Sequence, residues 1–238
     1  HDITLEGQEW VNKRIKRPSY VWWNFPVTDY CRSNLCMGRV YGLPQEPGSR
    51  ESMSGLVSNP MDKPEASKVT LFGIADYAWN INGFKSDEAW KEGIVRLYPQ
   101  AAEAMQAFVD HNSDQGPNGH GYRREESVNI ATVVNRVLEA AREGKVVKSD
   151  TALLKKEFSR MAAAAPVIRE KVDNPRLMKE IGAWVDAFEQ LGMAGQHAVA
   201  ALESSNPKAA VTNLVKATQA LAAMDRISQQ HNQQGQLY

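Results

Sequence analysis

Residues 20–25 read YVWWNF, and this short aromatic stretch decides the fold of the first half of the chain. Pro18 and Pro26 bound it, and its β-branched and aromatic residues are typical of a buried strand. Residues 54–58, SGLVS, predict a second short strand, which ends at Asn59-Pro60. Apolar residues at helical spacing precede the first strand at 5–17, and a helix-length apolar segment follows the second at 68–80. Strands that alternate with helices in this way are typical of βα units with parallel strands.

Two parallel strands do not make a stable sheet by themselves, because each would leave an open edge. Parallel sheets also need both of their faces covered. We therefore expect residues 1–124 to be part of a larger β/α fold, which other sequence completes, either on this polypeptide or on an accompanying one.

The second half of the chain, residues 125–238, predicts an antiparallel bundle of helices. Helical periodicity covers 128–145, 151–172 with an interruption at Pro166, about 177–203, and 208–231. Asn174-Pro175 and Asn206-Pro207 are typical of an N-cap followed by a first-turn proline. One buried face is expected from Ile181, Trp184, Val185, Phe188 and Leu191. The predicted fold class is thus α/β passing into all-α, with helix dominant.

Composition excludes several classes of protein. The chain has 238 residues, with 28 Lys+Arg against 28 Asp+Glu, so the basic excess of a nucleic-acid binder is absent. No run of 18 or more apolar residues predicts a membrane span. The chain opens at His1 without a signal sequence, which is expected of a mature or truncated product. Cys31 and Cys36 exclude a disulfide framework, and we expect them on a helix after the first strand as unpaired thiols.

A long loop is expected at residues 111–127, HNSDQGPNGHGYRREES. Loops of this length in compact domains are often functional or else disordered. His111, Asp114 and His120 lie in or at the start of it, but their spacing fits no zinc pattern. We therefore expect no metal here.

Polar side chains past the carboxyl end of a barrel strand face the active site. Trp22, Asn24 and Asp29 qualify at the first strand, and Asn59 qualifies at the second. An aromatic wall with two amides and a carboxylate suits a sugar ring. The alternative places Trp22 and Trp23 in the core and makes Asn24 and Asn59 cap or turn residues. Asp29 could likewise cap the next helix.

Three strings carry a family resemblance: WWNFPVTDY at 22–30, MSGLVSNPM at 53–61 and the loop at 111–127. Over these strings the chain resembles glycoside hydrolase family 84, most closely the bacterial members of the Bacteroides type. The likeness runs from about Leu5 to the helices beyond residue 180. It implies a catalytic (β/α)8 TIM barrel followed by a helical domain. This chain would then hold about the last two barrel strands (1–124) and the helical bundle (125–238).

The resemblance also implies an activity. The family removes β-linked N-acetylglucosamine with retention, by substrate-assisted catalysis through an oxazoline intermediate. Of two adjacent aspartates, one orients and polarises the acetamido group, and the other is general acid and then general base. This chain has no Asp-Asp pair. The pair is therefore expected upstream, so that the chain has no catalytic residue of its own and is active only with the amino-terminal remainder of the barrel.

By the same resemblance, five residues of this chain would bind substrate. Trp22 would wall the acetamido pocket, and Asn24 would lie close to the catalytic carboxylates. Asp29 would hold the O4 and O6 hydroxyls, Asn59 would bind hydroxyls, and His120 would reach the mouth of the pocket.

The remaining implications concern ligands and location. No cofactor is expected, and the substrate would be a glycan or protein that carries β-linked N-acetylglucosamine, hyaluronan fragments included. A periplasmic or secreted location follows from the resemblance. The alternative function is a non-catalytic helical scaffold or sugar-binding module derived from such an enzyme.

Overall fold

The computed structural model describes residues 2–29, 31, 33–114 and 126–231. The chain divides into two compact units, one of residues 1–99 with 112–125 and one of residues 100–111 with 126–238. The predicted boundary at 124/125 differs from this division at residues 100–111, which pack with the later helices. The helix in this segment, α5 (Ala102–Val109), lies against α7 (Lys148–Lys171) and so belongs to the helical unit.

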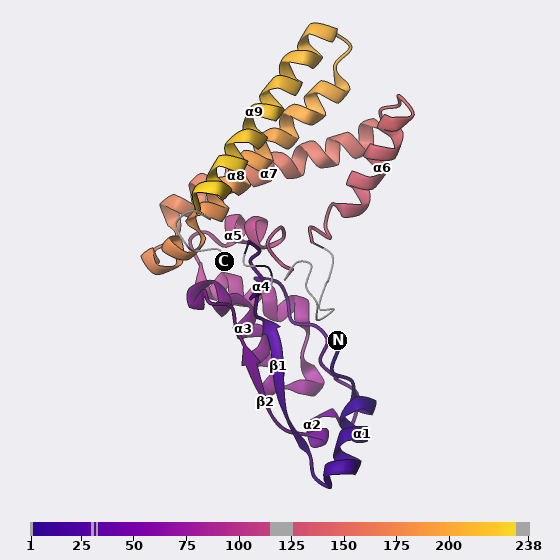
Figure 1. Cartoon of the computed structure of the whole chain (residues 1–238), viewed down its shortest axis with the longest axis vertical. Coiled ribbons are helices and arrows are strands. Elements are labelled where there is room, and N and C mark those ends of the chain that lie inside the picture. The colour runs from indigo at the N-terminus through magenta and orange to yellow at the C-terminus, as the bar shows by residue number, and fades with distance from the viewer. Residues whose placement is uncertain (1, 30, 32, 115–125, 232–238) are drawn as a thin grey trace. The chain divides into compact units, whose positions relative to one another are not determined.

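The first unit carries the two strands and the helices around them (Figure 1). Its elements in chain order are α1 (Leu5–Ile15), β1 (Ser19–Pro26), α2 (Ser49–Ser52), β2 (Met53–Asn59), α3 (Pro64–Trp79), the 3-10 turn η1 (Ile81–Gly83) and α4 (Ser86–Leu97). Both predicted strands are therefore confirmed. The helix expected at 68–80 begins four residues earlier, because Pro64 suits the first turn of a helix.

The two strands pair in parallel, as the βα pattern predicts, with Val21 opposite Leu56 and Trp22 opposite Val57. Side chains alternate between the two faces of a strand. Trp23 and Phe25 are accordingly buried and stack with their ring centroids 4.5 Å apart, while Trp22 is 68% exposed. The core of this unit thus lies on the Trp23 side of the sheet.

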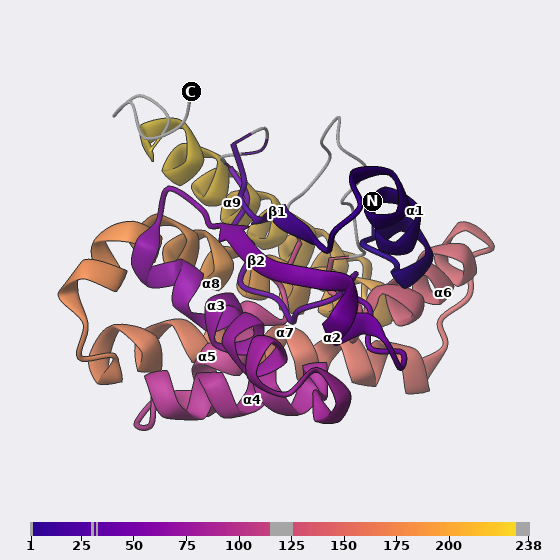
Figure 2. The ribbon, with the colours of Figure 1, turned by 90° about the horizontal axis from the view of Figure 1, so that it is seen from below.

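Helices α3 and α4 form an antiparallel hairpin beside the sheet (Figure 2). The Tyr77 ring meets Phe84 edge-on at 5.5 Å, and its hydroxyl donates to the Pro44 carbonyl at 2.7 Å. The buried Tyr77 therefore ties the end of α3 to both the following turn and the segment between the strands.

The helix expected to carry Cys31 and Cys36 is absent, and that prediction is wrong. The described residues between β1 and α2 contain turns and extended segments only. The Cys31 N–H donates to the Thr28 carbonyl at 2.9 Å, which closes a turn rather than a helix. Cys36 is fully buried, and neither thiol forms a disulfide in the described structure.

The second unit is helical in its described part. Besides α5 and α7 it contains α6 (Ala131–Arg142), α8 (Pro175–Glu203) and α9 (Pro207–His231). α8 packs against both α7 and α9, and the α8–α9 pair runs side by side in Figure 1. The expected helical bundle is confirmed, and Pro175 and Pro207 open α8 and α9 as predicted.

The interruption predicted at Pro166 is wrong, because α7 runs unbroken through it. A proline inside a helix removes one backbone hydrogen bond and crowds the preceding turn. Here Pro166 is exposed, while Ala165 and Ile168, which face the core, are completely buried. Packing of the buried face outweighs the local cost. None of the described helices is long and apolar enough to cross a membrane.

A close approach of α7 and α8 generates the first prediction. A Cβ at Gly192 would lie 2.6 Å from the Ala162 backbone nitrogen and 2.9 Å from the Phe158 carbonyl oxygen. Because these are backbone atoms, they cannot rotate away. We expect Gly192→Ala to lower the free energy of unfolding by about 1–3 kcal/mol in urea denaturation.

Gly182 is the matched control in the same helix, because a Cβ there meets no atom within 4 Å. Gly182→Ala should raise the free energy of unfolding by up to about 1 kcal/mol, the helix propensity that alanine adds. Equal effects of the two substitutions would contradict the close packing of α8 on α7.

The second prediction concerns Tyr77. Burial, helped by the charge of Glu46, raises the pKa of Tyr77 from 10.0 to about 12. The unfolded chain releases this proton first, so stability should fall as the pH rises from about 10 to about 12. Phenolate absorbance against a Tyr77→Phe control measures the pKa. A Tyr77 transition near 10.0 in the folded protein would refute the burial described above.

Candidate functional site

The carboxyl ends of β1 and β2 bring three polar or aromatic side chains together. The indole Nε1–H of Trp22 donates to Asn24 Oδ1 at 2.8 Å, and Asn59 Nδ2 donates to the same oxygen at 3.2 Å. We name Trp22, Asn24 and Asn59 the strand-end cluster. The structure thus unites three of the five residues predicted from sequence.

An irregularity in the strand pairing makes this contact possible. Trp23 pairs with Ser58, yet the next pair is Pro26 with Asn59, so β1 carries two extra residues at this point. Such bulges bend a strand and redirect a side chain. The Ser58 hydroxyl donates to the Phe25 carbonyl at 2.6 Å and ties the two strands together beside the bulge.

Within the cluster, Asn24 is the acceptor, and Trp22 and Asn59 are the donors. An amide oxygen has two lone pairs, and both donors at Asn24 Oδ1 come from within the cluster. Asn24 therefore orients Trp22 and Asn59. The face of Trp22 remains exposed, which suits stacking on the C–H face of a sugar.

Of the alternative roles, only that of Trp23 as a core residue is borne out. Trp22 is exposed and only Trp23 is a core residue. Asn24 and Asn59 bond to each other instead of capping a helix, since Lys63 occupies the N-cap position of α3.

Asp29 lies three residues beyond β1, in the turn closed by Cys31 N–H and the Thr28 carbonyl. Its side chain is exposed, and no interaction joins it to the strand-end cluster. It caps no helix either, because the next described helix, α2, begins at Ser49. The structure thus leaves the carboxylate accessible close in sequence to the cluster.

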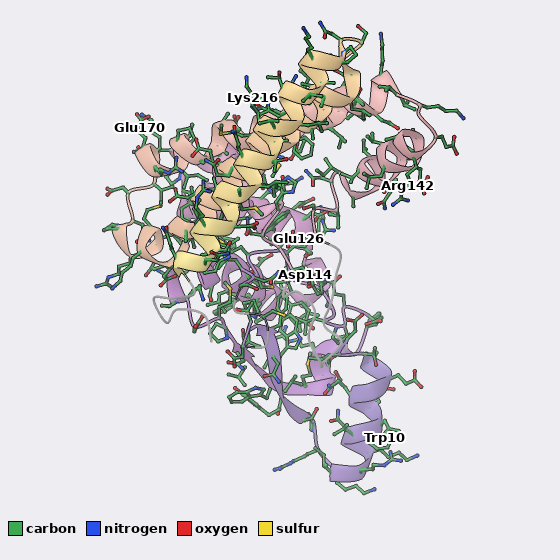
Figure 3. All side chains as sticks on the ribbon, turned by 45° about the horizontal axis from the view of Figure 1, so that its top comes forward. Trp10, Asp114, Glu126, Arg142, Glu170 and Lys216 are labelled. Carbon is green, nitrogen blue, oxygen red and sulfur yellow. The ribbon has the colours of Figure 1, made fainter. Side chains whose placement is uncertain are left out.

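His120 lies outside the described residues. The described chain stops at Asp114 and resumes at Glu126, both labelled in Figure 3. The structure therefore says nothing of the predicted place of His120 at the pocket mouth.

His111 belongs to a polar network in the helical unit that sequence reasoning missed. Its Nδ1 lies 2.8 Å from Ser127 Oγ, and its Nε2 lies 2.9 Å from Glu157 Oε1. Asn129 Nδ2 and an Arg160 N–H donate to the same Glu157 oxygen at 2.8 Å and 2.5 Å. Burial by itself would raise the pKa of Glu157, but these hydrogen bonds and charges outweigh it and hold the pKa below its usual value.

This network gives His111 a structural role. The described ranges contain no group of three or more His, Cys, Asp or Glu that could hold a metal ion. The members of this network come from segments far apart in the chain, so no local sequence pattern joins them. The only sequence signal for it is the helical periodicity that gives α7 a buried side.

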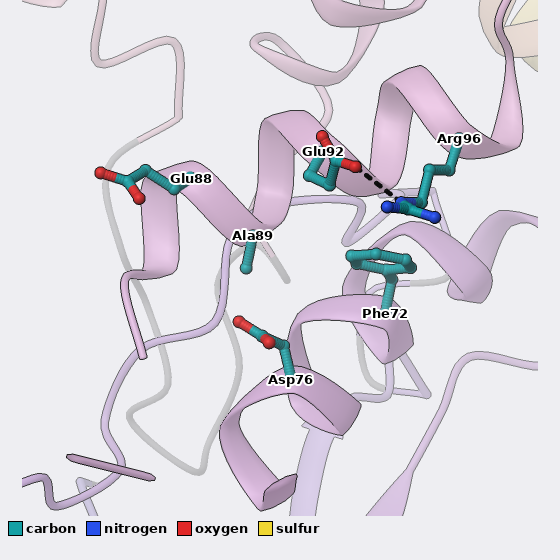
Figure 4. A pocket seen from close by; sticks show the side chains of 6 residues that line it. All are labelled: Phe72, Asp76, Glu88, Ala89, Glu92 and Arg96. Carbon is teal, nitrogen blue, oxygen red and sulfur yellow. Dashed lines mark hydrogen bonds and ion pairs between the residues drawn. The ribbon is translucent and has the colours of Figure 1, made fainter. Parts of the chain in front are cut away.

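A hollow of about 460 Å³ lies between α3 and α4, lined by Phe72, Asp76, Glu88, Ala89, Glu92 and Arg96 (Figure 4). Arg96 Nε donates to Glu92 Oε1 at 2.6 Å across one helical turn. Its walls come from the two helices, and the ends of the strands take no part in them. The hollow is therefore separate from the strand-end cluster.

Comparison with protein families gives two matches. The family described as beta-N-acetylglucosaminidase matches residues 1–110. The family described as bacterial GH84, post-catalytic domain, matches residues 126–236.

Solved structures give the same picture. CpGH84D is 30% identical to this chain, with a TM-score of 0.86 over 94% of this chain and 37% of its own. CpGH84B matches with a TM-score of 0.84 over 94% of this chain and 39% of its own, at 24% identity. A mutant Thermobaculum terrenum O-GlcNAc hydrolase, at 18% identity, shares the fold with a TM-score of 0.74 over 99% of this chain and 55% of its own.

Among curated relatives, the protein O-GlcNAcases of Rattus norvegicus and Mus musculus are each 33% identical over 87 residues. That alignment covers 36% of this chain and 9% of each relative. The chain therefore spans a small part of these relatives and 37–55% of the solved chains. Because the two family matches together cover both units apart from a short stretch between them, the chain belongs to glycoside hydrolase family 84.

Proposed function

We propose that this chain is the carboxyl-terminal part of a retaining β-N-acetylglucosaminidase and supplies sugar-binding groups to its active site. The observation that carries the proposal is the strand-end cluster. Trp22, Asn24 and Asn59 gather at the carboxyl ends of two parallel strands, which is the edge where β/α enzymes bind their substrates.

β1 and β2 are proposed to be the last two strands of a (β/α)8 barrel. The strands are parallel, and in the described structure they pair only with each other. The remaining strands and the adjacent aspartate pair would come from sequence that precedes residue 1. The helical unit, residues 100–111 and 126–238, would follow the barrel as a separate domain.

The chemistry of the cluster suits one hexose ring. The exposed face of Trp22 would wall the acetamido pocket. The Asn59 amide would bind hydroxyls, and the Asp29 carboxylate would accept hydrogen bonds from two hydroxyls. Each hydrogen bond to a charged group is worth about 1.5–3 kcal/mol. His120 is proposed to reach the mouth of the same pocket.

The proposed reaction uses the substrate's own acetamido group, a known exception to the two-carboxylate scheme. The acetamido oxygen attacks the anomeric carbon while one upstream aspartic acid protonates the leaving oxygen, which breaks the glycosidic bond and forms an oxazoline. Water then opens the oxazoline, and the same aspartate, now acting as general base, takes a proton from that water. The second aspartate polarises the acetamido N–H.

The substrate would be a glycan or protein with terminal β-linked N-acetylglucosamine, hyaluronan fragments included, handled by an exported enzyme. The alternative is a non-catalytic scaffold or sugar-binding module. In the enzyme, the strand-end cluster and an upstream aspartate pair act on the same substrate, whereas the scaffold or module does not use such a pair.

Hydrolysis of a chromogenic β-N-acetylglucosaminide is the direct test. The protein with its preceding barrel sequence should turn over this substrate, and residues 1–238 by themselves should not. A matched β-glucoside, which lacks the acetamido group, should react with neither. Activity of residues 1–238 alone would refute the upstream position of the aspartates. A folded, inactive complete protein would favour the scaffold.

Asp29→Ala should lower kcat/KM of the complete enzyme more than tenfold, because two sugar hydroxyls lose a charged acceptor. Asp87→Ala is the control. Asp87 lies on α4, and its exposed carboxylate pairs with Arg39. A wild-type kcat/KM for Asp29→Ala would remove Asp29 from the site.

A further inference from the structure

The turn between α3 and α4 requires glycine at position 83, directly after the exposed Asn82. In η1 the Asn80 side chain folds over Gly83, whose N–H donates to the Asn80 carbonyl at 3.2 Å and to Asn80 Oδ1 at 3.2 Å. A Cβ at position 83 would lie 2.5 Å from Asn80 Nδ2 and 3.0 Å from Asn80 Cγ. Only glycine fits there without moving Asn80.

The residue before this glycine is Asn82. Asn82 and Gly83 are both exposed to solvent. The Asn82 side chain makes no hydrogen bond with the described residues. Its amide carbon is therefore open to attack by the next backbone nitrogen, and a glycine, which lacks a Cβ, hinders that attack least.

We propose that Asn82 is a site of spontaneous deamidation, and that Asn80 slows the reaction by holding the Gly83 N–H. The ligand class at this site is water. The reaction requires neither an enzyme nor an oxidant, and it does not depend on the proposed glycosidase activity.

The chemistry balances as a net hydrolysis. The Gly83 nitrogen loses its proton to base and bonds to the Asn82 side-chain carbonyl carbon. The carbon–nitrogen bond of the side-chain amide breaks, ammonia leaves and a cyclic imide remains. Water then adds to one of the two imide carbonyls and opens the ring, which gives aspartate or isoaspartate.

Asn80 opposes the first step because the proton that must leave is shared between its two oxygens. Both hydrogen bonds are at the long end of the usual range. The helical backbone of η1 also holds Asn82 away from the extended shape that ring closure needs. The folded turn should therefore react more slowly than an unfolded chain, but it should still react.

Isoaspartate would disturb the hairpin more than aspartate, because it adds one carbon to the main chain. Phe84 lies two residues on and packs edge-on against the buried Tyr77. The extra atom would shift this contact. The 16-residue helix α3 separates η1 from the end of β2, where the strand-end cluster lies. Glycosidase activity should not change.

The experiment incubates the complete protein at mildly alkaline pH and follows each asparagine by peptide mass spectrometry. Wild-type protein should gain about one dalton at Asn82, more slowly than the urea-unfolded protein. Asn80→Ala should speed this gain about fivefold, the effect of one lost hydrogen bond of ordinary strength. Asn206 is an internal control, because Pro207 has no N–H to attack with.

Two further variants separate the consequences. Asn82→Gln should give no deamidation product at this position. Asn82→Asp should have the same thermal midpoint as fresh wild-type protein, whereas aged wild-type protein should have a lower thermal midpoint. The proposal fails if Asn82 stays intact in the folded protein while the unfolded chain is converted. It also fails if folded Asn80→Ala, with native circular dichroism, reacts no faster than wild type.

Discussion

The parallel pairing of β1 with β2 is the constraint on which the candidate site depends. Parallel strands end at the same edge, so residues near their carboxyl ends can meet, although Asn24 and Asn59 are 35 positions apart in the chain. The bulge between Trp23 and Pro26 then redirects Asn24. One oxygen, Asn24 Oδ1, accepts from both Trp22 and Asn59. Strand alternation exposes the Trp22 side chain, and the shared acceptor orients both its indole N–H and the Asn59 amide.

Sequence reasoning predicted what local chemistry controls. An aromatic and β-branched run between Pro18 and Pro26 predicted the first strand, a short run that ends at Asn59-Pro60 predicted the second, and Pro175 and Pro207 predicted two helix starts. It failed where packing outweighs a local rule: α7 continues through Pro166 because its opposite face is buried. It also placed Cys31 on a helix where the chain turns instead.

The candidate site was predictable only in part, because its members were found by their position toward the carboxyl ends of the two strands. Which side chains touch depends on the strand register, and the bulge at Asn24 has no sequence signature of its own. The polar network of His111 with Glu157 was missed for a related reason: its residues are 46 positions apart. Distant partners such as these become neighbours only once the helices have packed.

In the proposed function, the exposed face of Trp22 meets an N-acetylglucosamine ring. The most direct measurement is the ¹⁵N–¹H resonance of the Trp22 indole in the complete protein during titration with N-acetylglucosamine, assigned with Trp22→Phe. The Trp22 resonance should shift in a saturable way, and those of Trp10 and Trp79, which are also exposed, on α1 and α3, should not. A stationary Trp22 resonance in a folded protein that still binds the sugar would place Trp22 outside the sugar site.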